Sequence, residues 1–130
     1  MKFSRVVFLI AAIWGVLLIG PLYFLLDLIG RIDPPAITHP VYFYGFAGVA
    51  LAWQIAFFII AKNPARYRPF MIPSILEKVA YGGAVAILFL EGRLRASDLL
   101  FGMADLLFAA LFIVAYRKVG THGGNSRNYD

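Results

Sequence analysis

Long apolar runs alternate with short polar segments along this chain. Each run is about 20 residues long, which is the length that an α-helix needs to cross the hydrocarbon layer of a membrane. The runs are apolar on nearly every face, whereas a helix of a soluble bundle keeps a polar stripe. The pattern therefore predicts an all-α, integral membrane four-helix bundle in residues 1–119, with spans at about residues 6–29, 41–61, 72–90 and 97–116.

The composition supports a membrane location. Hydrophobic residues make up 62% of the chain and charged residues only 15%, against about a quarter in an ordinary soluble domain. The net charge is +5, but the basic residues lie at the ends of the runs, which suits anionic lipid headgroups rather than nucleic acid. There is no cysteine, so disulfides and thiol catalysis are excluded. The segment 120–130 is small and polar, and we expect it to be a disordered tail.

The stretch from Lys62 to Ser74 determines the predicted orientation. It contains Lys62, Arg66 and Arg68, and three prolines that prevent one continuous helix. Loops rich in Lys and Arg stay on the cytoplasmic side of a membrane. With this stretch inside, eight basic residues lie on the cytoplasmic side and three on the other. We therefore predict a multi-pass protein of a bacterial inner membrane with both termini in the cytoplasm.

Several residues predict where the helices bend, begin and end. Pro21 is expected to bend the first span, and Pro40 suits the first position of the second. The third span is expected to begin at a capping box made by Ser74 and Glu77, and Gly92 to close it in the left-handed conformation.

Ionisable and polar residues inside a span are the candidates for a functional site. Asp105 lies near the middle of the fourth span, and Gln54 falls at a similar depth in the second. Asp105 is either a proton-linked or ligand-contacting group, or a polar anchor that joins two helices. A hydrogen bond between Gln54 and Asp105 is the simpler structural explanation. The neighbouring Trp53 is a further ligand-binding candidate, although a residue of this kind more often faces the core or lipid.

Glu77 and Tyr81 form a second candidate pair. The predicted capping box accounts for Glu77, but if it turns inward together with Tyr81, both join a polar pocket. The adjacent Lys78 is expected to extend its ammonium group to the inner surface.

The residues that are missing limit the chemistry. Both histidines, His39 and His122, lie outside the predicted spans, which excludes bis-histidine haem ligation and helical di-iron sites. The span interiors hold no serine or threonine for a hydrolase, and no phosphate-binding glycine loop is present. We therefore expect no catalytic residue, metal ligand or cofactor, and no enzymatic activity.

The layout resembles the small four-span bacterial membrane proteins of the DoxX-like kind. The resemblance covers Tyr42–Glu77 and the lysine that follows it, with Tyr44-Gly45-Phe46, Ala52-Trp53-Gln54, Arg66-Tyr67-Arg68-Pro69 and Leu76-Glu77-Lys78. Some members of that family accompany a quinone-linked oxidoreductase, and the resemblance implies no catalytic residue. A weaker similarity, in span number and buried acids, exists to sterol-binding isomerase bundles of the emopamil type.

These observations lead to one functional hypothesis and two alternatives. The first is an accessory or scaffold protein that binds membrane lipid, quinone or another membrane subunit, with no nucleic-acid partner. One alternative is a proton-coupled small carrier or channel, which would act as a homo-oligomer because four spans are few for a carrier. The other is a sterol- or lipid-modifying enzyme, which requires an enclosed cavity that touches Asp105 and Glu77 together.

Overall fold

The computed structural model describes the backbone of residues 2–125 and the side chains of residues 2–121, and every regular element in this part is a helix. The long helices are α1 (Lys2–Ile19), α3 (Pro40–Lys62), α4 (Met71–Leu90) and α5 (Ala96–Asn125). The short ones are η1 (Gly20–Phe24), α2 (Leu26–Ile32) and η2 (Arg68–Phe70). The all-α prediction is confirmed. Four helical segments in this part are long and apolar enough to cross a membrane, which indicates a multi-pass membrane protein.

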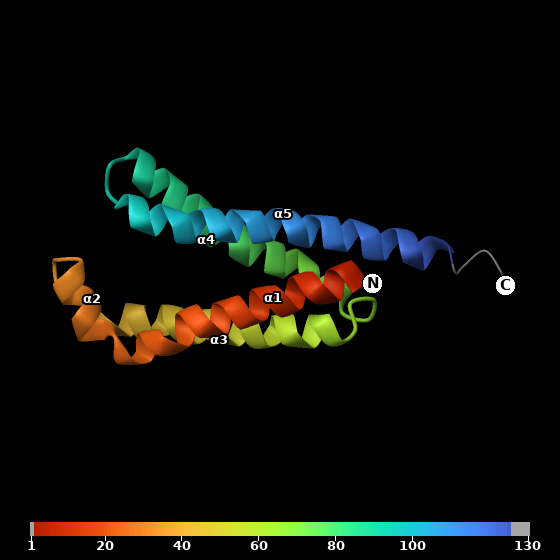
Figure 1. Ribbon diagram of the computed structural model, residues 1–130, viewed down its shortest axis with the longest axis horizontal. Coiled ribbons are helices and arrows are strands. Elements are labelled where there is room, and N and C mark those ends of the chain that lie inside the picture. The colour runs from red at the N-terminus through yellow and green to blue at the C-terminus, as the bar shows by residue number, and fades with distance from the viewer. Residues whose placement is uncertain (1, 126–130) are drawn as a thin grey trace.

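The four long helices form two antiparallel pairs (Figure 1). Helix α1 packs along α3, and α4 packs along α5. The two pairs meet mainly through α1 and α5, whereas α3 and α4 touch each other only slightly. The bundle is therefore closed on the α1–α5 side and loosely packed on the α3–α4 side.

Within the described residues, the basic segments that were assigned to the inner side lie toward one end of the molecule. The start of α1 and the loop between α3 and η2 lie at this end, α5 runs past them in the same direction, and α2 lies at the opposite end (Figure 1). Arg68 joins the loop to α5, because its Nε donates to the carbonyl of Tyr116 at 3.0 Å and its guanidinium lies 3.8 Å from the Tyr116 ring centre. The hydroxyl of Ser4 likewise donates to the Ala115 carbonyl at 3.3 Å.

Three phenylalanines form the centre of the core near this basic end. Phe8, Phe57 and Phe112 are fully buried and come from α1, α3 and α5. The rings of Phe8 and Phe112 stack with centres 4.1 Å apart, and Phe57 meets the Phe112 ring edge-on at 5.1 Å. Such offset and edge-on pairs add to the stabilisation from burial alone. Beyond them the bundle becomes polar inside.

The first span changes geometry where the sequence predicts a bend. Helix α1 ends at Ile19, and Gly20–Phe24 continue as the 3₁₀ helix η1. Pro21 has no backbone N–H to donate, so the α-helical bonding pattern cannot run through it. Pro40 is the first residue of α3, and Gly92 follows α4 with φ of +71°, both as predicted.

Two expectations at helix ends are wrong. Helix α4 begins at Met71, three residues before Ser74, and the Ser74 hydroxyl donates back to the Phe70 carbonyl at 2.7 Å. Ser74 therefore does not cap the helix, and Glu77 is not held by a capping box. Helix α5 runs on to Asn125, so the first part of the predicted tail is helical, while residues 126–130 lie outside the described residues.

Candidate functional site

A small, partly open cavity with polar and apolar side chains in its wall lies between the helices, on the side of the phenylalanine core away from the termini. Its volume is about 40 Å³, and α1, α3, α4 and α5 all contribute to its wall. The polar side chains that line it are Gln54, Glu77, Lys78, Tyr81 and Asp105. Four of the five candidate residues are thus brought together by the fold, and Lys78 is added to them.

Lys78 is the electrostatic centre of the cavity. Its Nζ lies 3.2 Å from Oδ1 of Asp105 and 3.6 Å from Oε2 of Glu77, and its side chain is only 4% exposed. The ammonium also lies 5.3 Å from the ring centre of Phe57 and 5.7 Å from that of Phe108. The expectation that Lys78 reaches the inner surface is therefore wrong. The neighbouring carboxylates hold it in the interior, where a lone charge would be costly.

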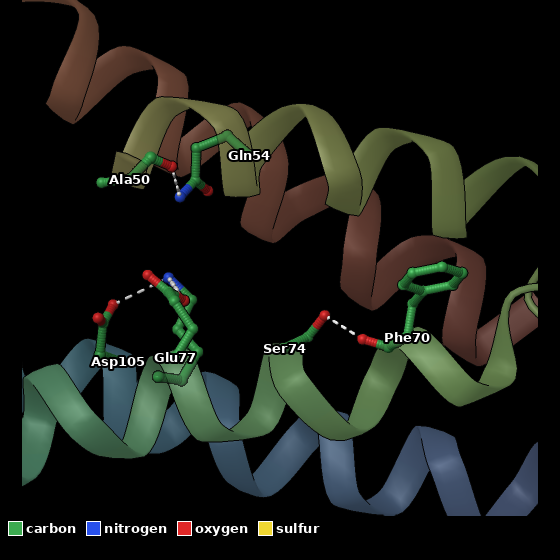
Figure 2. A network of polar contacts seen from close by, with 7 residues as sticks. Ala50, Gln54, Phe70, Ser74, Glu77 and Asp105 are labelled. Carbon is green, nitrogen blue, oxygen red and sulfur yellow. Dashed lines mark hydrogen bonds and ion pairs between the residues drawn. The ribbon is translucent and has the colours of Figure 1, made fainter. Parts of the chain in front are cut away.

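Gln54 does not bond to Asp105, so that predicted pairing is also wrong. Its Nε2 donates to the carbonyl of Ala50, one turn earlier in α3, at 2.9 Å, and Asp105 pairs with Lys78 instead. Gln54 and Asp105 do lie at a similar depth along the bundle, as predicted, because both line the same cavity. Figure 2 shows Gln54 and Asp105 on facing helices of the two pairs.

Gln54 fits against α1 only because residue 15 is a glycine. A Cβ at Gly15 would overlap Oε1 and Cδ of Gln54. Gln54 itself is 2% exposed, and its Oε1 has no hydrogen-bond partner among the described residues. Gly15 therefore leaves room for the buried amide of Gln54 against α1, and both residues belong to the wall of the cavity.

Glu77 and Tyr81 both turn inward, which was the condition for the predicted polar pocket that contains them. The Glu77 side chain is 19% exposed, and the Tyr81 ring stacks on Phe46 of α3 with centres 5.8 Å apart. These two residues line the cavity and also a wider groove outside it. They form the boundary between the buried polar groups and the outer surface of the bundle.

The groove follows the weak contact between α3 and α4 and has a volume of about 490 Å³. Its wall is apolar except for Glu77, the Tyr81 hydroxyl and the indole N–H of Trp53. Gly45, Phe46, Val49, Ala50 and Ala80 complete it. Trp53 lies here and against the Phe57 ring at 6.3 Å, so it reaches the groove and not the cavity. Cavity and groove share Phe46, Ala50, Glu77 and Tyr81. The two spaces are neighbours with a common wall.

Sequence reasoning missed the roles of Lys78 and Gly15. The sequence could have identified Lys78, because it lies near the middle of the candidate span Arg68–Leu90. Any ionisable residue inside a span is a candidate for a functional site. Gly15 carried none, since its importance depends on which helix faces it. In the part of the chain that the structure describes, no group of three or more His, Cys, Asp or Glu residues is placed to hold a metal ion.

Comparisons of the chain with protein-family models, with curated proteins and with solved structures find no match.

Proposed function

We propose that this protein binds an amphipathic molecule of the lipid or quinone kind, which it takes from the bilayer, as an accessory subunit or scaffold of a membrane complex. The observation that carries the proposal is the shared wall between a small cavity that holds five polar side chains and an open apolar groove. The polar end of the ligand would reach Glu77 and Tyr81, and its apolar part would lie along Val49 and Trp53.

The dimensions of the groove support a ligand of this kind. Its volume of about 490 Å³ falls within the range of about 300–1,000 Å³ that is usual for small-molecule sites. Its mostly apolar wall, with a few polar groups at one place, is the usual composition of such a site. The loose α3–α4 contact gives a ligand a lateral entrance from lipid.

The same proposal places the protein in a bacterial inner membrane with both termini in the cytoplasm. The gathering of the basic segments at one end of the bundle supports this orientation, because positively charged loops stay inside. The cavity would then lie near the middle of the bilayer, well below the phospholipid headgroups.

The proposal can be tested by placing a larger side chain in the groove and measuring how much ligand stays bound to the protein. Val49 lines the groove and is 63% exposed, whereas Ile55 on the same helix is 55% exposed and lies outside it. We expect Val49→Phe to lose most of the lipid or quinone that native mass spectrometry detects on the gently extracted wild-type protein. Ile55→Phe should keep it.

Two outcomes would contradict the proposal. One is a wild-type protein that carries no small molecule after mild extraction. The other is equal retention by both variants, which would place the bound molecule elsewhere on the surface.

The two alternative functions fit the geometry less well. A sterol-modifying reaction would bring the substrate's reacting carbon to Glu77 and Asp105, but the space of about 40 Å³ beside them takes a head group and no ring system. A proton-coupled carrier is favoured by the mid-span charges around Lys78. It stays a hypothesis that needs a homo-oligomer, since four spans are few for a carrier.

A further inference from the structure

Two oxygen atoms at the cavity are buried without a hydrogen bond in the described part of the chain: Oε1 of Gln54 and Oε2 of Glu77. The second has only the longer ion-pair contact with Nζ of Lys78, at 3.6 Å. The orientation of the Gln54 amide follows from its neighbour, because the Ala50 carbonyl can only accept and so must face the NH₂ group. A buried acceptor without a donor costs about 1–3 kcal/mol. The ligand that suits this site is therefore a hydrogen-bond donor.

The formal charge of the cavity also calls for a positive partner. Lys78 contributes one positive charge, and Glu77 and Asp105 contribute two negative charges if both are ionised, which leaves a net charge of −1. The titratable groups that face Glu77 are Lys78 and Tyr81 on α4 and Asp105 on α5, while α1 and α3 present only uncharged side chains to the cavity. An unbalanced charge in a membrane interior is costly, so one proton or one cation is expected there.

We propose that Glu77 and Gln54 hold either one proton or the ammonium group of a cationic amphiphile, and never both. In the first state the Glu77 carboxyl is protonated and donates to Oε1 of Gln54, directly or through a water. In the second state the ammonium N–H groups donate to both oxygens. The exchange balances: R–NH₃⁺ plus the Glu77 carboxylic acid gives the R–NH₃⁺ carboxylate pair and releases one H⁺.

The size and lining of the cavity support the proposal that it holds a proton or one ammonium group, but not both. A volume of about 40 Å³ takes one or two groups the size of water, each of which occupies about 30 Å³ in the liquid, so it suits an ammonium head group. Phe46 and Tyr81 stand at the boundary with the groove, and aromatic faces attract cations. A quinone has only carbonyl oxygens, which cannot donate a hydrogen bond to Oε1 of Gln54 or Oε2 of Glu77, so its head group is the poorer match.

The inference rests on the proposed function in one respect, since the ligand is taken to reach the cavity through the groove. The test therefore uses separate variants for the two parts. Phenethylamine serves as the probe, and 2-phenylethanol is its uncharged analogue with the same ring. Binding to the purified protein in nanodiscs is measured by calorimetry, and proton release by a pH indicator in weak buffer.

We expect the wild-type protein to bind the amine, to release one proton for each amine bound, and to bind about tenfold more tightly for each unit of pH rise while Glu77 is protonated. Glu77→Gln should lose both the binding and the proton release. Glu91→Gln, which changes an exposed carboxyl beyond the end of α4, should behave as the wild type. Gln54→Leu should weaken amine binding while keeping Glu77, and it serves as the second test if Glu77→Gln does not fold.

Equal affinity for the amine and the alcohol would overturn the proposal, as would amine binding without proton release. Tighter binding of a short-chain quinone than of the amine would also overturn it. Loss of binding in Glu77→Gln with full binding in Val49→Phe would keep the inference and remove the groove as the entrance. In that case the proposed function would fail on its own.

Discussion

Lys78 determines how much negative charge the four helices can bury around the cavity. It is the single cation within 4 Å of Glu77 and Asp105 in the described part of the chain. Removing one partner from a buried ion pair leaves the other charge uncompensated, which costs far more than the pair contributes when intact. Because Lys78 serves two carboxylates, its loss should be worse than the loss of either of them.

We therefore expect Lys78→Met to destabilise the protein by about 3–5 kcal/mol, the cost of stranding buried charge. Asp105→Asn should cost clearly less, because it leaves Lys78 and Glu77 as a one-to-one pair. Equilibrium unfolding in mixed micelles measures both variants. A larger loss in Asp105→Asn than in Lys78→Met would show that Asp105 has a further partner that this account lacks.

At the scale of the elements, the packing of α4 on α5 aims the charged residues into the bundle. A Cβ at Gly82 of α4 would lie 2.6 Å from Cγ of Leu106 and 2.9 Å from the Gly102 carbonyl oxygen, both on α5. A Cβ at Gly102 would in turn lie 2.5 Å from Cγ1 of Val85. Two glycines thus let the helices approach closely, as small residues do in membrane bundles. This contact fixes the rotation of α4 and so the direction of Glu77 and Lys78.

Gly82 and Gly83 offer a matched test of this contact. A Cβ at Gly83 would meet nothing within 4 Å, so Gly83→Ala keeps the packing. Both changes gain the same helix propensity, and the difference between them reports the contact alone. We expect Gly82→Ala to be less stable than Gly83→Ala by about 1–3 kcal/mol, the usual cost of overpacking. Equal thermal unfolding of the two variants in detergent would contradict the close α4–α5 contact.

The whole molecule shows which features the sequence was able to predict. The lengths of the apolar runs predicted the four long helices, because bilayer thickness sets those lengths. Buried polar residues were identified by type, and Gln54, Glu77, Tyr81 and Asp105 do meet at one cavity. Their pairing was not predicted, because it depends on the rotation of each helix, and contacts at Gly15 and Gly82 set that rotation. The resemblance to DoxX-like proteins stays a prediction.

The position of the cavity follows from how tightly the helices are joined at each end of the bundle. The phenylalanine core and the ties made by Ser4 and Arg68 close the bundle at the basic end. At the other end an ion pair between Arg95 and Asp33, at 3.1 Å, links the α4–α5 loop to the α2–α3 loop. Both side chains are half exposed, so the pair adds little stability. The helices are thus tightly joined at one end only, and the polar groups collect beyond the core.

We propose that the four helices cross the bilayer with the basic end in the cytoplasm, which puts the cavity in the membrane interior. The chain has no cysteine, so single cysteines can be introduced without background labelling. Ala65 and Thr38 are exposed positions at opposite ends, in the α3–η2 loop and before α3. With an impermeant maleimide on intact cells, Thr38→Cys should be labelled, and Ala65→Cys only after permeabilisation. Labelling of Ala65→Cys in intact cells, or of both variants alike, would contradict this account.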